Sequence, residues 1–286
     1  MAVDQRDCVP IPQPPGYVFV GNITDVDPEL PIQSLANLAD QYGPIYSLTT
    51  FGKRRIIVTS QELVNELCDE KRFGKTVSAG LAELRNGIGD GLFTAHNEEE
   101  NWGIAHRVLV PAFGPLNLTD MFDDMKDIAS QLILKWARYG ESYKIPAADD
   151  FTRLTLDTLA LCAMDYRFNS FYTEQQHPFI DAMLNFLKIG GARARRPGYL
   201  APFYRSEDQV FERDVKYMRD LSAEIVQQRR VQPKDGKDLL NAMVKGRDPK
   251  TGKGLKDEVI INNMITFLIA GEFKKYGPYM GSTDNA

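Results

Sequence analysis

Residues 257–271 read DEVIINNMITFLIAG, and this stretch decides which kind of fold the chain can form. From Ile265 onward the segment has no polar face. Such a helix belongs inside a protein, because every side of it has to be covered by other elements. The sequence therefore predicts a buried helix within a mainly helical protein.

The N-terminal part of the chain is predicted to hold a small β-sheet. A first helix is expected over residues 31–42, where Gly43 and Pro44 end it. The segments IYSLTT (45–50) and RRIIVTS (54–60) are rich in β-branched residues and are joined by a turn-like FGK, which is typical of a β-hairpin. Helices dominate from there on, so the fold class is mainly α with a small β-sheet.

The remaining helices are expected from apolar periodicity and from capping residues. They begin after Ser60, cover 119–139 and 151–165, run from Pro178 to Gly190-Gly191, and include a long helix capped by Ser206. The expected inner stripes are Phe122, Met125, Ile128, Leu132, Ile133 and Trp136 in the first long helix, and Phe211, Val215, Met218, Leu221 and Ile225 in the last. No repeat or linker interrupts this series, so residues 1–271 are predicted to form one domain.

Composition excludes several classes of protein. The chain has 286 residues, of which 43% are hydrophobic and 26% charged, as in ordinary globular proteins. Its net charge of -5 argues against a nucleic-acid partner, because binding to phosphates needs a basic surface. We find neither a signal peptide nor a membrane span, and Cys8, Cys68 and Cys162 form no CxxC pair. These features predict a cytoplasmic protein with reduced thiols.

Two local patterns are weak evidence for a site. The histidines His96, His106 and His177 have no metal-binding spacing, so no metal site is predicted, and His177 is expected to be a loop residue. The glycine-rich GIGDG at 87–91 lacks the lysine of a phosphate-binding loop. A turn that lets the backbone approach another element closely is the better interpretation.

The segment ENWGIAHRVLVPAF (100–113) is more informative. It predicts a short helix ended by Pro111, on which Trp102 and His106 share a face because they lie four residues apart. Two ring N–H groups aimed in one direction can bind an anion such as a carboxylate. Spacing alone favours the alternative, in which Trp102 is an ordinary core residue and His106 its neighbour.

Six stretches together resemble a known family. They are KRFGKT, GDGLFTA, NWGIAHRVLVPAF, RLTLDTLALCAMDYRFNSFY, HPFIDAML and ITFLIAG. In order and spacing they resemble the N-terminal half of the cytochrome P-450 fold, and most closely the haem domain of self-sufficient fatty-acid hydroxylases, which are fused to their own reductase. The likeness runs from about Val9 to Gly271.

The resemblance implies a haem cofactor and names residues for it. Trp102 and His106 would donate hydrogen bonds to a haem propionate, and Lys75 would support the same anionic edge. FAD, FMN and NADPH would belong to the reductase of the intact relative. The implied activity is NADPH- and O2-dependent hydroxylation of a fatty acid or a similar hydrophobic molecule.

The resemblance also implies a substrate pocket. Phe93 would stand over the haem face, Ala270 would belong to the pocket above it, and Lys53 would bind the fatty-acid carboxylate. Positions matching the family's pocket lining are Leu81, Leu84 and Ile88. These three are equally consistent with the core of a helix, and Lys53 stands among three cations of FGKRR that solvent alone can satisfy.

The likeness stops within the buried helix. In the family this helix continues from Ala270 and Gly271 into an acid–threonine pair, whereas Glu272 and Phe273 follow here. Residues 272–286 match nothing in the family and are predicted to be a disordered tail. We expect a truncated, inactive product without the iron-ligating cysteine loop, and we assign no catalytic residue and no metal ligand.

A non-catalytic fragment that binds a hydrophobic ligand or a chaperone is the alternative function. It follows from the expectation that the last helix is left partly bare, because its covering elements would lie beyond Gly271. The apolar patch expected there consists of Val259, Ile260, Met264, Ile265, Phe267, Leu268 and Ile269. A patch of this size favours aggregation or chaperone binding.

Overall fold

The computed structural model describes residues 9–27, 30–69, 71–77, 80–194, 196 and 203–271. Cys8 and the predicted tail 272–286 lie outside these residues. The described chain is mainly helical with one two-stranded antiparallel sheet, so the predicted fold class is confirmed. It forms two compact units, one before residue 75 and one from residue 75 onward, and each is described by itself. The expectation of one domain over residues 1–271 stays a prediction.

The smaller unit holds the sheet. Its elements are η2 (Ile23–Asp25), α1 (Pro31–Tyr42), β1 (Ile45–Thr50), β2 (Lys53–Val58) and α2 (Gln61–Leu67). The strands pair in antiparallel register with Thr50 opposite Lys53, and both residues of the turn between them have positive φ. This conformation is typical of a two-residue hairpin. The predicted helix, hairpin and Ser60 cap are confirmed, since the Ser60 side chain accepts a hydrogen bond from the Leu63 amide.

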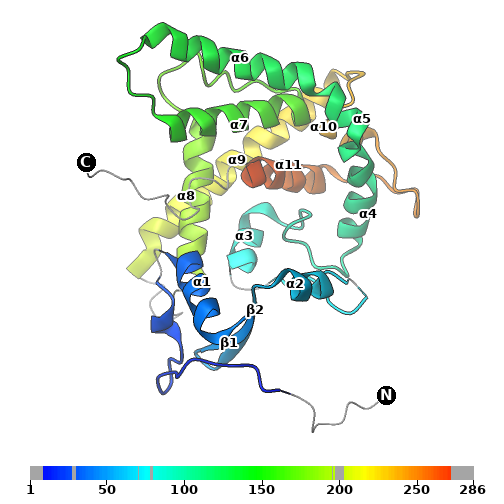
Figure 1. Cartoon of the computed structure of the whole chain (residues 1–286). Helices are drawn as coiled ribbons and strands as arrows, with labels where there is room; N and C mark the ends of the chain where they lie inside the picture. The colour runs from blue at the N-terminus through cyan, green and yellow to red at the C-terminus, as the bar shows by residue number, and fades with distance from the viewer. Residues whose placement is uncertain are drawn as a thin grey trace. The chain divides into compact units, whose positions relative to one another are not determined.

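Among its described residues, the larger unit has helices joined by loops and no β-strand. It contains α3 (Gly80–Ile88), α4 (Glu100–Leu109), η3 (Val110–Phe113), α5 (Pro115–Asp120), α6 (Phe122–Tyr139), α7 (Ala147–Met164), α8 (Pro178–Arg193), α9 (Arg205–Val231), α10 (Leu239–Lys245) and α11 (Asp257–Gly271). Helix α11 crosses the middle of this unit, between α3 and the layer formed by α7, α9 and α10 (Figure 1). None of the described helices is long and apolar enough to cross a membrane.

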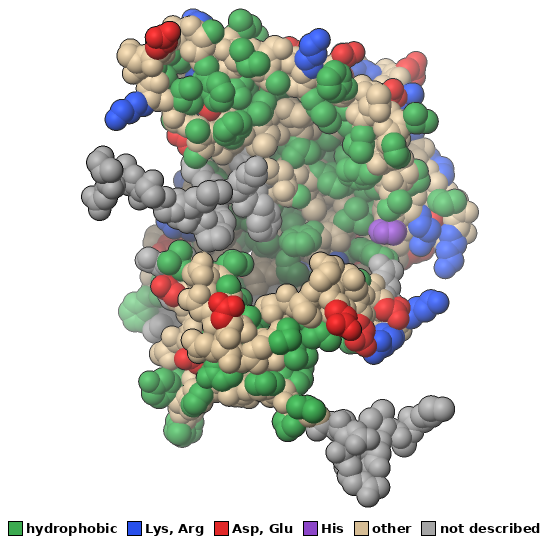
Figure 2. All heavy atoms as spheres, viewed as in Figure 1, with side chains coloured by type: hydrophobic (Ala, Val, Ile, Leu, Met, Phe, Trp, Pro, Cys, Tyr) green, Lys and Arg blue, Asp and Glu red, His purple; other side chains and the backbone are tan. Residues whose placement is uncertain are grey.

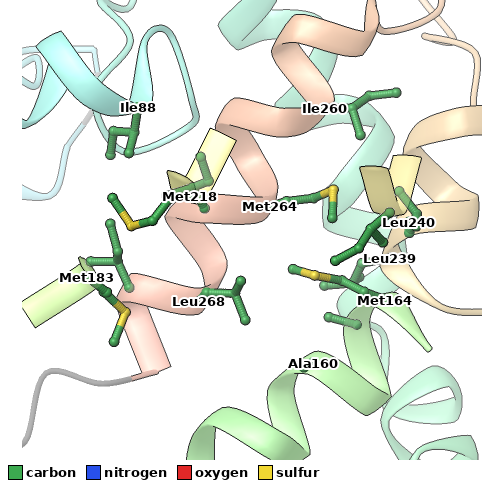
Figure 3. Close-up of a cluster of buried hydrophobic side chains, with 14 of the residues drawn as sticks. Ile88, Ala160, Met164, Met183, Met218, Leu239, Leu240, Ile260, Met264 and Leu268 are labelled. Atoms are coloured by element: carbon green, nitrogen blue, oxygen red, sulfur yellow. The ribbon is translucent and has the colours of Figure 1, made fainter. Parts of the chain in front are cut away.

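The predicted burial of α11 is confirmed, and the expected bare patch on it is wrong. Met183, Met218 and Ile88 lie on one side of the helix, and Met164 and Leu240 lie on the other (Figure 3). Of the seven residues expected to be bare, six are at most 3% exposed and Phe267 is partly buried. The helices that precede α11 in the chain cover it themselves. Ala270, at the end of α11, is exposed.

Helix α6 is less buried than its periodicity suggests. The expected helix 119–139 is divided at Met121 into α5 and α6. On the expected stripe Ile128 and Leu132 are buried, whereas Phe122 is 62% and Ile133 63% exposed. The reason is that α6 packs mainly against α7 and is covered on one side only. Apolar side chains consequently gather on the surface over α5 and α6 (Figure 2).

The boundaries of α8 and α9 correct three predictions. Helix α8 continues past Gly190 and Gly191 to Arg193, and Gly190 packs beside Leu84 of α3 and Phe211 of α9 within the helix. Helix α9 begins one residue before Ser206, which therefore does not cap it. His177 is the N-cap of α8 and not a simple loop residue, since its ring nitrogen Nδ1 accepts a hydrogen bond from the Phe179 amide at 3.2 Å. The predicted inner stripe of α9 is confirmed.

Candidate functional site

The loop at residues 89–95 lies against α11, as the interpretation of GIGDG requires. Gly89 has a φ of +54°, in the region that favours glycine. A Cβ atom on Gly91 would lie 2.5 Å from Oγ1 of Thr266 and 2.9 Å from the carbonyl oxygen of Asn262. Glycine at this position lets the loop backbone touch the helix. The predicted close approach is confirmed, and its partner is α11.

Phe93 and Lys75 meet at this loop. The Phe93 side chain is 42% exposed. The Lys75 ammonium donates to the carbonyl oxygens of Leu92 at 3.1 Å and of Phe93 at 3.2 Å. Because an ammonium group has three donors, one remains for a ligand. Partial burial lowers the pKa of Lys75, and nearby Arg85 lowers it further, while Glu99 opposes both.

Trp102 and His106 share one face of α4, as their spacing predicts. Their rings are stacked with centroids 5.0 Å apart and planes inclined by 23°. Trp102 is half-buried and His106 is exposed. Among the described residues, the ring nitrogens of both side chains have no hydrogen-bond partner. The pair forms a stacked aromatic surface on α4, and a role in binding an anion stays a prediction.

An ion pair between Arg85 and Glu99, which the sequence did not indicate, connects the elements around the 89–95 loop. Arg85 of α3 donates to both carboxylate oxygens of Glu99, at 3.1 and 2.5 Å, and to the carbonyl oxygen of Thr94 at 2.7 Å. The backbone oxygen of Glu99 in turn accepts from the Trp102 amide at 3.1 Å. Arg85 thus connects α3, the 89–95 loop and the start of α4. No local pattern marks a pair separated by 14 residues.

The far end of α4 is held by a second ion pair. Arg107 donates to the two carboxylate oxygens of Asp248 at 2.6 and 2.9 Å. These bonds, together with those from Thr251 and the Lys250 amide, hold the pKa of Asp248 well below its usual range. Asp248, in the loop 246–254, is buried and holds this end of α4 through Arg107.

The predicted pocket residues differ in their surroundings. Ile88 is 1% exposed and lies in the core, and Leu84 packs against that core beside Gly190. Leu81 is half-buried. Helix core is therefore the observed setting of Leu84 and Ile88, and a pocket-lining role for all three stays a prediction. Lys53 is exposed on β2 of the smaller unit, and its predicted contact with a carboxylate also stays a prediction.

The described cysteines differ in their surroundings. Cys68 is exposed at the end of α2. Cys162 is buried in α7, and burial, with a smaller effect of Asp124, raises its pKa to about 11. In the absence of a metal ion, a thiol with this pKa stays protonated at neutral pH. The described residues also contain no group of three or more His, Cys, Asp or Glu side chains placed to hold a metal ion.

Comparison with known proteins supports the resemblance. The family model "Cytochrome P450" matches residues 11–272. The chain is 58% identical over 271 residues to a bifunctional cytochrome P450/NADPH–P450 reductase of Aspergillus oryzae. It is 51% identical to a self-sufficient cytochrome P450 monooxygenase of Exserohilum turcicum. Each alignment covers 95% of this chain and 25% of the relative, so the chain spans about a quarter of the length of these curated relatives.

Proposed function

Because this chain belongs to the cytochrome P450 family, we propose that it forms the part of a haem-dependent fatty-acid monooxygenase that binds the haem edge and lines the substrate pocket. The observation that carries the proposal is the Trp102–His106 stack, whose ring nitrogens lack partners among the described residues. The Aspergillus oryzae relative is named as a fusion with a reductase, and the Exserohilum turcicum relative as a self-sufficient monooxygenase. The proposal therefore includes a reductase, fused or separate, as the electron donor.

The residues of the site fit the anionic edge of haem. Trp102 and His106 each bring a ring N–H to one face of α4, and Lys75 keeps one donor beyond its two carbonyl partners. Hydrogen bonds from such groups to a carboxylate are charge-assisted when Lys75 is protonated. The three side chains would hold the propionates, and haem with a thiolate ligand would supply the oxygen chemistry.

Other residues would orient the substrate. Phe93 projects from a loop that is fixed against α11, so its ring would limit the approach of an acyl chain. Ala270 has a small side chain, which would leave room for the acyl chain, and Lys53 would pair with the substrate carboxylate. The pocket positions Leu81, Leu84 and Ile88 would contribute apolar surface from α3.

We also propose that a polypeptide of these 286 residues, assayed alone, does not hydroxylate. An anionic sulfur is needed on the iron, and none of Cys8, Cys68 and Cys162 stands in a glycine- and arginine-containing loop of the kind that carries the family's ligand. Proton delivery is a second requirement, yet Phe273 stands where the family has its threonine.

The test is an assay for hydroxylated product from a saturated fatty acid with haem, NADPH and a separate reductase. The chain is compared with a hybrid in which the residues after Gly271 come from the Aspergillus oryzae relative. We expect product only from the hybrid. Product from the 286-residue chain alone would refute the proposed inactivity, and a folded hybrid without product would refute the proposed activity.

A further inference from the structure

Helix α11 carries two neighbouring asparagines that the core and the proposed haem edge leave unexplained. Asn262 is 1% and Asn263 0% exposed, in a helix that is otherwise largely apolar. Burying an amide side chain is costly unless all its polar atoms are paired. The partners of these two amides therefore show what they do.

Asn263 binds the backbone of the 89–95 loop. Its Oδ1 accepts from the Leu92 amide at 2.9 Å, and its Nδ2 donates to the Val259 carbonyl within α11 at 2.8 Å. The carbonyl oxygen of the same Leu92 accepts from the Lys75 ammonium at 3.1 Å. Asn263 thus fixes Leu92, which immediately precedes Phe93 and whose carbonyl oxygen binds the Lys75 ammonium.

Asn262 ties the same loop to two further helices. Its Oδ1 accepts from Arg219 of α9 at 2.7 Å, and its Nδ2 donates to Oδ1 of Asp90 at 2.8 Å. The other oxygen of Asp90 accepts from Asn101 of α4 at 2.6 Å. One chain of hydrogen bonds therefore joins α9, α11, the loop and the helix that carries Trp102.

We infer that Asn262 and Asn263 are positioning residues, which hold residues 89–95 against α11 and so set where Phe93 and Lys75 stand. The close approach of Gly91 to Thr266 leaves the loop little freedom to shift toward α11. The inference rests on the proposed function, in which Phe93 faces the acyl chain and Lys75 the propionate. The two asparagines would then determine specificity without touching the substrate.

Hydrogen exchange of the full 286-residue chain without any ligand tests the positioning itself. The variant Asn263→Ala removes the acceptor of the Leu92 amide, and Gly91→Ala pushes the loop away from the α11 backbone while both asparagine side chains remain. Asn241→Ala is the matched control, because this asparagine of α10 is also buried and donates to two carbonyl oxygens outside its helix.

We expect exchange in residues 89–95 to become roughly two- to tenfold faster in both loop variants, the effect of losing a typical hydrogen bond. The control should leave this loop unchanged. If Asn263→Ala and Asn241→Ala accelerate exchange by the same factor throughout the unit, or if neither loop variant changes residues 89–95, the inference is overturned.

A haemin titration followed by tryptophan fluorescence separates this inference from the proposed function. With the loop released, Lys75 loses its fixed partners, so we expect weaker haemin binding in Asn263→Ala and unchanged binding in Asn241→Ala. Faster loop exchange with no haemin binding to any variant would refute the proposed function and leave the loop contact standing. Haemin binding that is equal in Asn263→Ala and in the unaltered chain would overturn the positioning role.

Discussion

Replacing Leu268 by alanine tests whether the helices before Gly271 bury α11 by themselves. Leu268 is 1% exposed and belongs to the core around Met264 and Met183 (Figure 3). A leucine-to-alanine change in such a core costs about 2–5 kcal/mol, because apolar contacts are lost and a cavity remains. For a unit of this size that loss corresponds to a fall in Tm of roughly 4–20 °C.

The assay is thermal unfolding of the 286-residue chain followed by circular dichroism. Ile133→Ala is the control, because this side chain of α6 is 63% exposed and its removal should change stability by at most about 0.5 kcal/mol. We expect a large fall in Tm for Leu268→Ala and almost none for the control. Equal Tm values for the two variants, together with strong binding of a hydrophobic dye by the unaltered chain, would refute the buried position of α11.

Two further predictions concern stability. Burial lowers the pKa of His177 against the opposing effect of Asp157, so the folded state favours the neutral ring, and stability should fall as pH drops from about 7 to 5. His177→Asn keeps an N-cap acceptor and should lose less stability over this range in urea titrations; equal losses would contradict the assignment. Asp238→Ala should cost about 3–5 kcal/mol, because it removes both the nearest carboxylate of the buried Arg229 guanidinium, at 2.9 Å, and the N-cap of α10, and leaves Arg229 only Asp165 at 3.9 Å. A loss below about 1 kcal/mol in urea unfolding, as for a surface ion pair, would show that Arg229 is solvated.

Apolar periodicity and helix-ending residues predicted much of the fold, because they depend on which side chains are buried and where the backbone can remain helical. The helix over residues 31–42 ends at glycine and proline, and the hairpin is fixed by its β-branched strands. The shared face of Trp102 and His106 follows from helical spacing alone. Periodicity predicted less where a helix packs on one side only, which is why Phe122 and Ile133 are exposed.

The contacts that assemble the candidate site could not be predicted from the sequence. Asn263 and Leu92 are 171 residues apart, and no local rule pairs a helical asparagine with a distant backbone amide. The same holds for Arg85 and Glu99, which only the folding of α3 onto α4 brings together. The covering of α11 was predicted wrongly for a related reason, because apolar stripes do not specify which helices they meet.

We propose that residues 1–271 supply the haem-facing part of a cytochrome P450 domain. The most direct measurement is the absorption spectrum, reduced under carbon monoxide, of the hybrid with the Aspergillus oryzae relative, beside its Trp102→Ala and His106→Ala variants. We predict a thiolate-type band in the hybrid and lower haem content in both variants at equal folded protein. A folded hybrid that takes up no haem, or variants that retain as much haem as the hybrid, would contradict the claim.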